Sequence, residues 1–128
     1  MQTVASHTTR DELLKGFARA LFTNDMDALY RVVSPDFLWS FHDGFITKSL
    51  RCPDAIREHL MEEKARFTEQ RFHEVVYHHS TDATFMTFRV SETLRQTGER
   101  REQRGVERYT FSEGKIATKD VYRKPITL

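Results

Sequence analysis

The sequence lacks several features that would narrow its function at once. A single cysteine in 128 residues allows no disulfide within the chain and supplies no cysteine-based metal site. No apolar run approaches the length of a membrane-spanning helix, and the first residues lack the basic start and apolar core of a secretion signal. The net charge is only +1, and the charges of both signs are interspersed. This predicts neither a nucleic-acid partner nor a membrane partner, and we expect a cytoplasmic protein.

Helical patterns occupy the N-terminal part of the chain. Thr9 and Glu12 in "TTRDELLKGFARALF" stand at capping-box spacing, and an apolar stripe with helical period follows them. We predict a helix from about residue 10 to residue 23. A second, shorter helix is expected to begin after Asn24 or Asp25, either of which can act as its N-cap.

The rest of the chain reads as strands interrupted by one further helix. "DFLWSF" alternates aromatic and smaller residues, and the pair Asp43-Gly44 after it is suited to a tight turn. Pro53 opens a third helix, where its missing N–H costs nothing. Four long strands follow from about residue 70. The order predicts an α+β fold with helices packed on one face of a curved antiparallel sheet.

The last two strands, "GVERYTFSEGKIATKDVYRK", form a hairpin whose register decides which charges face each other. A two-residue loop at Glu113-Gly114 would set Glu107 opposite Asp120, which is a repulsive pair. Glutamate is also a poor first residue for such a turn. A three-residue loop that adds the preceding serine sets Glu107 opposite Lys119, so we predict that register. One face then carries Glu107, Tyr109, Phe111, Ala117, Lys119, Val121 and Arg123, and the other carries Val106, Arg108, Thr110, Ile116, Thr118, Asp120 and Tyr122.

The order of elements, with "NDMDALYRVVSPDFLW", "PDAIREHL" and the terminal hairpin, resembles the nuclear transport factor 2-like superfamily, specifically its SnoaL-like branch. The resemblance covers about residues 9 to 124. It implies a cone, in which a strongly curved antiparallel sheet wraps around the N-terminal helices and leaves a pocket at the open end. We therefore expect a tail at residues 1–8 and a single SnoaL-like domain at residues 9–128. A homodimer through the convex sheet face and no cofactor are also expected.

The resemblance further implies that the first face of the hairpin is the concave one. His42 is placed at the mouth of the pocket, although "HDG" is explained equally well by turn chemistry. The implied ligand-binding residues are Phe17, Trp39, Phe41, His42, Met86, Phe88, Val90, Phe111, Val121 and Arg123.

Known catalysts of the superfamily can be compared with this chain position by position. Ketosteroid isomerases use a carboxylate base on the first strand and a tyrosine on the first helix, and Phe41 and Phe17 occupy those positions here. Neither phenylalanine can carry a proton, so that mechanism is not expected. The carboxylate, arginine, carboxylate set of the epoxide hydrolases cannot be assembled either, because Glu107 is the only carboxylate placed inside.

Glu107 remains as the candidate proton-transfer group, with Tyr109 beside it and Lys119 as the cation that keeps it ionised. This set suits an isomerase, cyclase or dehydratase acting on a small, apolar, oxygenated molecule. The alternatives are a salt bridge without catalytic role in a ligand-binding protein, or an association module of the same fold. A metal site is not expected, because His73 and His79 are predicted to share one strand face at wide separation.

Overall fold

The computed structural model describes residues 7–43 and 45–126. Its helices are α1 (His7–Thr23), α2 (Met26–Val32) and α3 (Pro53–Arg66). Its strands are β1 (Val33–Asp43), β2 (Ile46–Leu50), β3 (Phe67–His79), β4 (Thr84–Leu94), β5 (Arg100–Ser112) and β6 (Lys115–Pro125).

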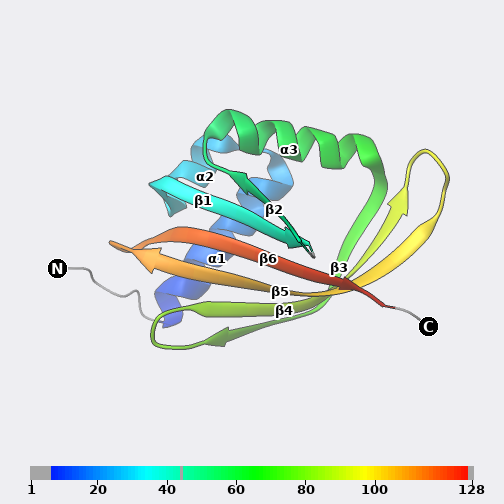
Figure 1. The fold of residues 1–128 in the computed structure, drawn as a ribbon. Coiled ribbons are helices and arrows are strands. Elements are labelled where there is room, and N and C mark those ends of the chain that lie inside the picture. The colour runs from blue at the N-terminus through cyan, green and yellow to red at the C-terminus, as the bar shows by residue number, and fades with distance from the viewer. Residues whose placement is uncertain (1–6, 44, 127–128) are drawn as a thin grey trace.

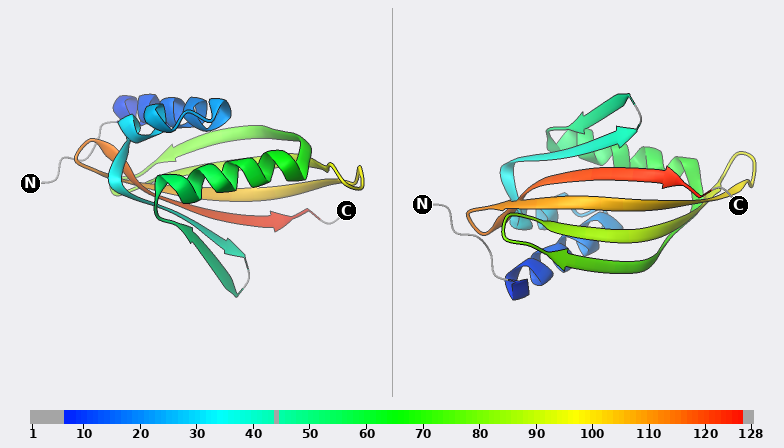
Figure 2. Two further views of the ribbon diagram at one scale, coloured as in Figure 1. Left: turned by 90° about the horizontal axis from the view of Figure 1, so that it is seen from above. Right: turned by 60° about the horizontal axis from the view of Figure 1, so that its bottom comes forward.

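The six strands form one sheet in the order β2-β1-β6-β5-β4-β3, antiparallel except for the parallel pair β1 and β6. Figure 1 shows α1 behind this curved sheet and α3 across its top, and Figure 2 shows α1 and α2 on one side of it. The predicted α+β class and the curved sheet packed against helices are confirmed. The side of the sheet that faces α1 and the core is called the inner face below, and the opposite side the outer face.

The two N-terminal helices pack through short apolar stripes. The buried apolar side chains of α1 are Leu14, Phe17 and Ala20, at 2%, 2% and 1% exposure. The helix begins at His7, three residues earlier than predicted, so Thr9 lies inside it and the predicted capping box is wrong. The helix α2 begins as expected, because the Asp25 side chain accepts a hydrogen bond from a backbone N–H of its first turn.

A buried arginine fixes α1 against the sheet. Arg10 is only 1% exposed, and its guanidinium donates to the backbone carbonyls of Ser80, Thr81 and Ala83 at 2.5, 2.9 and 3.2 Å. The same group lies 4.9 Å from the ring centre of Phe111. One end of the helix is thereby tied to the β3–β4 turn and to β5.

The terminal hairpin differs from the predicted register. Ser112 pairs with Lys115, so the loop has the two residues Glu113 and Gly114, with φ of 51° and 77°. These positive values are those of a tight hairpin turn, and glutamate adopts one of them despite its unfavourable propensity.

An extra residue in β6 then changes the pairing beyond the turn. Phe111 pairs with Ile116, but Thr110 pairs with Thr118, so Ala117 is the unpaired residue of a β-bulge. Below the bulge, Glu107 faces Val121 and not Lys119. The bulge also turns Ile116 into the core at 0% exposure, where the outer face was predicted. For the remainder of the hairpin the predicted division into faces holds.

A second bulge changes the faces of β3. The register shifts between His73 and Val76, where Glu74 has a positive φ of 53°. As a result, His73 contacts the outer-face Ser91 while His79 contacts the buried Thr84. The two histidines therefore lie on opposite faces, and the prediction that they share one is wrong.

Candidate functional site

One buried polar group on the inner face joins three side chains from β5 and β6. Glu107, Tyr109 and Lys119 are 3%, 3% and 5% exposed. Nζ of Lys119 lies 3.5 Å from Oε1 of Glu107, and the Tyr109 hydroxyl donates a hydrogen bond to the same oxygen. Because Lys119 is the direct ladder partner of Tyr109, it reaches Glu107 diagonally.

Aromatic rings enclose this group. The Lys119 ammonium lies 4.2 Å from the ring centre of Trp39 and 4.9 Å from that of Phe17. Phe17 in turn makes edge contacts with Trp39 and Tyr109, at centroid distances of 6.3 and 6.0 Å. Burial lowers the pKa of Lys119, and the Glu107 charge acts in the opposite direction. Burial raises the pKa of Tyr109 well above its ordinary value, and the neighbouring Glu107 adds to this, so the hydroxyl keeps its proton.

A second charged group lies further along the same strands, and sequence reasoning missed it. Its centre is Glu92 of β4, only 2% exposed, with its carboxylate oxygens 3.2 Å from Arg101 and 3.6 Å from Arg123. Gln70 of β3 donates a further bond of 2.6 Å to Glu92. Glu107 is therefore not the only carboxylate inside. The alternation of Met86, Phe88 and Val90 on β4 continues to Glu92 and could have revealed it.

The helix α3 turns two titratable side chains toward these strands. The His59 ring lies 4.8 Å from the Phe41 ring and 5.3 Å from the Trp39 ring, and its Nε2 is 3.7 Å from the Glu63 carboxylate. Burial lowers the pKa of His59 to about 4, and the Lys48, Lys119 and Arg123 charges contribute. Burial also raises the pKa of Glu63. The His59 side chain is 11% exposed.

Two buried donors on the inner face have no hydrogen-bond acceptor among the described residues. They are Nε1 of Trp39 and Nε of Arg123. The Arg123 side chain is 24% exposed, its Nη1 faces Glu92, and its guanidinium lies 5.6 Å from the Phe88 ring. A buried N–H without an acceptor is costly, so each such group calls for a specific explanation.

Most of the predicted ligand-binding residues lie on the inner face. Phe17, Trp39, Met86, Phe88, Val90 and Val121 are buried in the core, while Phe41, Phe111 and Arg123 are partly exposed.

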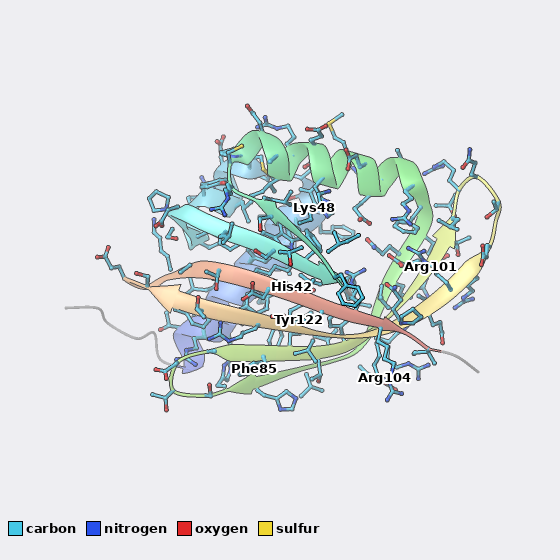
Figure 3. All side chains as sticks on the ribbon, viewed as in Figure 1. His42, Lys48, Phe85, Arg101, Arg104 and Tyr122 are labelled. Atoms are coloured by element: carbon cyan, nitrogen blue, oxygen red, sulfur yellow. The ribbon has the colours of Figure 1, made fainter. Side chains whose placement is uncertain are left out.

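His42 lies elsewhere. Its ring stacks on Tyr122 at 4.6 Å, and Nε2 is 3.4 Å from Asp120, which also pairs with Arg108. These residues belong to the outer face, and Figure 3 shows His42 and Tyr122 there, apart from Arg101. The structure thus separates His42 from the inner-face groups.

Two hollows are present near α3, and neither is lined by the residues of the inner face. One, of about 400 Å³, is lined by Asp54, Arg57, Glu58, Met61, Glu62 and Ala65. The other, of about 440 Å³, is lined by residues 23–27 and Arg57. The predicted pocket at the open end of the cone is therefore not among these two hollows.

Two further observations concern residues 7–43 and 45–126 only. No three side chains of His, Cys, Asp or Glu come together there as a metal site requires. None of the helices there is both long enough and apolar enough to cross a membrane.

The fold is that of nuclear transport factor 2-like proteins. A nuclear transport factor 2-like protein from Burkholderia xenovorans superposes with a TM-score of 0.82 at 16% identity, over 93% of this chain and 92% of that one. TerC, co-crystallised with polyporic acid, superposes with a TM-score of 0.75 at 14% identity, over 91% of this chain and 92% of that one. A phenazine biosynthesis-related protein from Pseudomonas aeruginosa gives 0.71 at 12% identity over 97% and 83%. At these identities the likeness establishes the fold alone.

The family follows from the sequence. Residues 14–119 match the model of the SnoaL-like domain, which is most of the chain, so this protein belongs to the SnoaL-like family. A comparison with curated proteins gave no match.

Proposed function

We propose that this protein binds a small, largely apolar, oxygenated molecule on the inner face of its sheet, where Glu107 exchanges a proton with it. The observation that carries the proposal is the buried pair of Glu107 and Lys119, whose ammonium lies against the rings of Phe17 and Trp39. That the structurally similar TerC was crystallised with polyporic acid supports a small organic ligand. Side chains at the partly exposed end of the inner face, such as Phe41, have to move apart to admit it.

The chemistry would begin with removal of a proton from a carbon next to a carbonyl. Glu107 takes this proton, and the electron pair of the broken C–H bond moves onto the carbonyl oxygen, giving an enolate. Lys119 stabilises the new negative charge, and Tyr109 holds the carboxylate in position. Return of the proton to another carbon is an isomerisation, loss of a hydroxyl group as water is a dehydration, and attack of the enolate on a second carbonyl is a cyclisation.

The alternative is a ligand-binding protein without turnover. Its support is that Oε1 of Glu107 is already engaged by both neighbours, and that the group is only 3% exposed. Phe17 of α1, which packs against the inner face, and Phe41 on that face also offer no proton-transfer group.

The first experiment is a thermal-shift screen of wild type and Glu107→Gln against small oxygenated apolar compounds. A ligand that binds only the native state, present at a concentration of 100 times its Kd, adds about 2.7 kcal/mol to the free energy of unfolding. It raises the midpoint of thermal unfolding by several degrees. Each hit is then incubated with the protein in D₂O, and NMR follows exchange of the hydrogens next to its carbonyl.

Proton transfer by Glu107 predicts exchange in the wild type and its loss in Glu107→Gln, with binding retained. The matched control is Asp120→Asn, which removes an outer-face carboxylate from the same hairpin and should leave exchange unchanged. Binding without exchange in the wild type would favour the non-catalytic alternative. Absence of any hit would contradict the proposed function and favour an association module.

A further inference from the structure

Resting on the proposed function, we propose that the ligand is an organic anion, and that its carboxylate or equivalent oxygen is bound by Arg123 with the ring system directed toward Trp39. Three features of the inner face support this. They are the balance of charge around Glu92, the two donors without acceptors, and the cations that act on His59.

The charges of the inner face do not cancel. Glu107 pairs with Lys119, but Glu92 is shared by two guanidinium groups, those of Arg101 and Arg123. These five groups therefore carry one positive charge in excess. Glu63 is the nearby carboxyl on α3; burial raises its pKa, and the charge of Arg123 acts in the opposite direction. An anionic group bound beside Arg123 would balance the excess charge of the five groups.

The donors without acceptors belong to the same region. Arg123 directs Nη1 at Glu92 while its buried Nε has no acceptor, so one edge of the guanidinium is available to an oxygen. Nε1 of Trp39 is the second such donor. Both are N–H groups without acceptor capacity, so a ligand that pairs with them has to bring acceptor atoms, such as carboxylate oxygens, and not further donors.

The spacing of these residues indicates the size of the ligand. Trp39 is the ladder partner of Lys119 on β6, and Arg123 lies four residues beyond Lys119 on the same face. At about 3.3 Å per residue this is roughly 13 Å between backbone positions, which the side chains shorten. A molecule of one or two fused rings carrying an acidic group would span this distance once the side chains between the two ends move apart. Phe41, stacked on Trp39 at 5.3 Å, provides an aromatic surface between the two ends.

The environment of His59 is consistent with a positive potential here. The pKa of its ring is lowered by burial first, and then by three cations on β2 and β6: Lys48, Lys119 and Arg123. A carboxylate also lies near the ring, that of Glu63, 3.7 Å away.

The test compares acids with their neutral amides, which have nearly the same shape. We would titrate wild type with phenylacetate and with 2-naphthylacetate, each beside its carboxamide, and follow ¹⁵N–¹H spectra. Trp39 is the single tryptophan, so its indole N–H gives one cross-peak that reports on Nε1 directly. Because hydrogen bonds to charged groups are about twice as strong as neutral ones, we expect the acids to bind about tenfold more tightly than the amides. The indole cross-peak should move when an acid binds.

Arg123→Gln should reduce the preference for the acid to about twofold or less. The matched control is Lys124→Gln, which removes the same charge from the next residue of β6 on the exposed outer face, and it should keep the tenfold preference. Circular dichroism verifies that both variants fold; if Arg123→Gln does not, the wild-type preference and the indole cross-peak still decide whether the ligand is an anion bound near Trp39.

Each outcome bears on the proposal. Equal binding of acid and amide would overturn it while leaving the proposed function intact. A preference that survives Arg123→Gln would overturn the assignment to Arg123, and an indole cross-peak that does not move would overturn the role of Trp39. If neither the acids nor the amides bind, the result counts against the proposed function itself, and the inference fails with it.

Discussion

His59 makes the stability of the protein depend on pH in a way that can be calculated. In the folded state the pKa of His59 is about 4, compared with an ordinary value of 6.5, because the ring is buried and faces cations. The unfolded chain therefore binds a proton at a higher pH than the folded chain does. The stabilisation is fully present above about pH 6.5 and is lost as the pH falls from 6.5 toward 4.

The magnitude follows from the two pKa values. One pKa unit corresponds to about 1.4 kcal/mol, so the whole shift corresponds to about 3 kcal/mol, of which about 2 kcal/mol is lost by pH 5. The side chain is only 11% exposed, so screening by solvent removes little of this. Glu63 is the carboxyl that would oppose the shift, and burial raises its pKa as well.

The assay is urea unfolding of wild type and His59→Gln at several values of pH between 5 and 7.5. Groups that titrate in both proteins cancel in the difference between their free energies of unfolding. Between pH 7.5 and pH 5, the free energy of unfolding of wild type should fall by about 2 kcal/mol more than that of His59→Gln. Lys48→Gln, which removes a half-exposed cation, should raise the pKa of His59 by less than one unit, and Lys124→Gln on the outer face should leave it unchanged.

Two results would refute this reasoning. The first is a difference in the free energy of unfolding between wild type and His59→Gln that stays constant between pH 5 and pH 7.5. The second is an NMR titration of the wild-type His59 ring with a midpoint close to 6.5. Either would mean that water reaches the ring between α3 and the sheet.

Three further predictions concern the sheet. Lys119→Met should lower the free energy of unfolding in urea by about 3–5 kcal/mol, because it leaves Glu107 buried without its cation. The double variant Lys119→Met, Glu107→Gln should recover most of this loss. Gly105→Ala should lower the free energy of unfolding by about 1–3 kcal/mol, because the Cβ of the new alanine would lie 2.3 Å from the Phe88 ring. Unchanged stability would mean that the ring can move aside. If the exposed outer face forms the proposed homodimer, Tyr122→Arg should shift the protein toward monomer in sedimentation velocity, and a wild type that is monomeric at micromolar concentration would contradict it.

The order and type of the elements could be predicted because the signals that specify them are local. Pro53 at the first position of α3 and Asp25 at the cap of α2 act within one helical turn, and both occur where the sequence indicates. The start of α1 could not be placed as well. The helix begins at His7, so His7 and Thr8 are helical although the capping pattern favours a later start.

The register of the last hairpin could not be predicted, because both registers considered assumed an uninterrupted ladder. The rejected two-residue loop is the one present, and Ala117 then bulges out, so Glu107 faces neither Asp120 nor Lys119 directly. The bulge removes the repulsion with Asp120 that counted against the short loop. A bulge changes the pairing by one residue, and no local propensity at Ala117 signals it.

On the inner face, too, the features set by one strand could be predicted and those set by contacts between strands could not. Alternation along one strand is local, so Glu92 could have been assigned to the face of Val90 from β4 alone. Its partners could not, because Arg101 and Arg123 reach it from β5 and β6, and only the register decides which residues meet across strands. The excess positive charge arises because Arg101 and Arg123, on two different strands, both lie against Glu92 on a third. The anion-binding proposal therefore rests on the part of the structure that the sequence leaves undetermined, and the comparison of acid and amide tests that part directly.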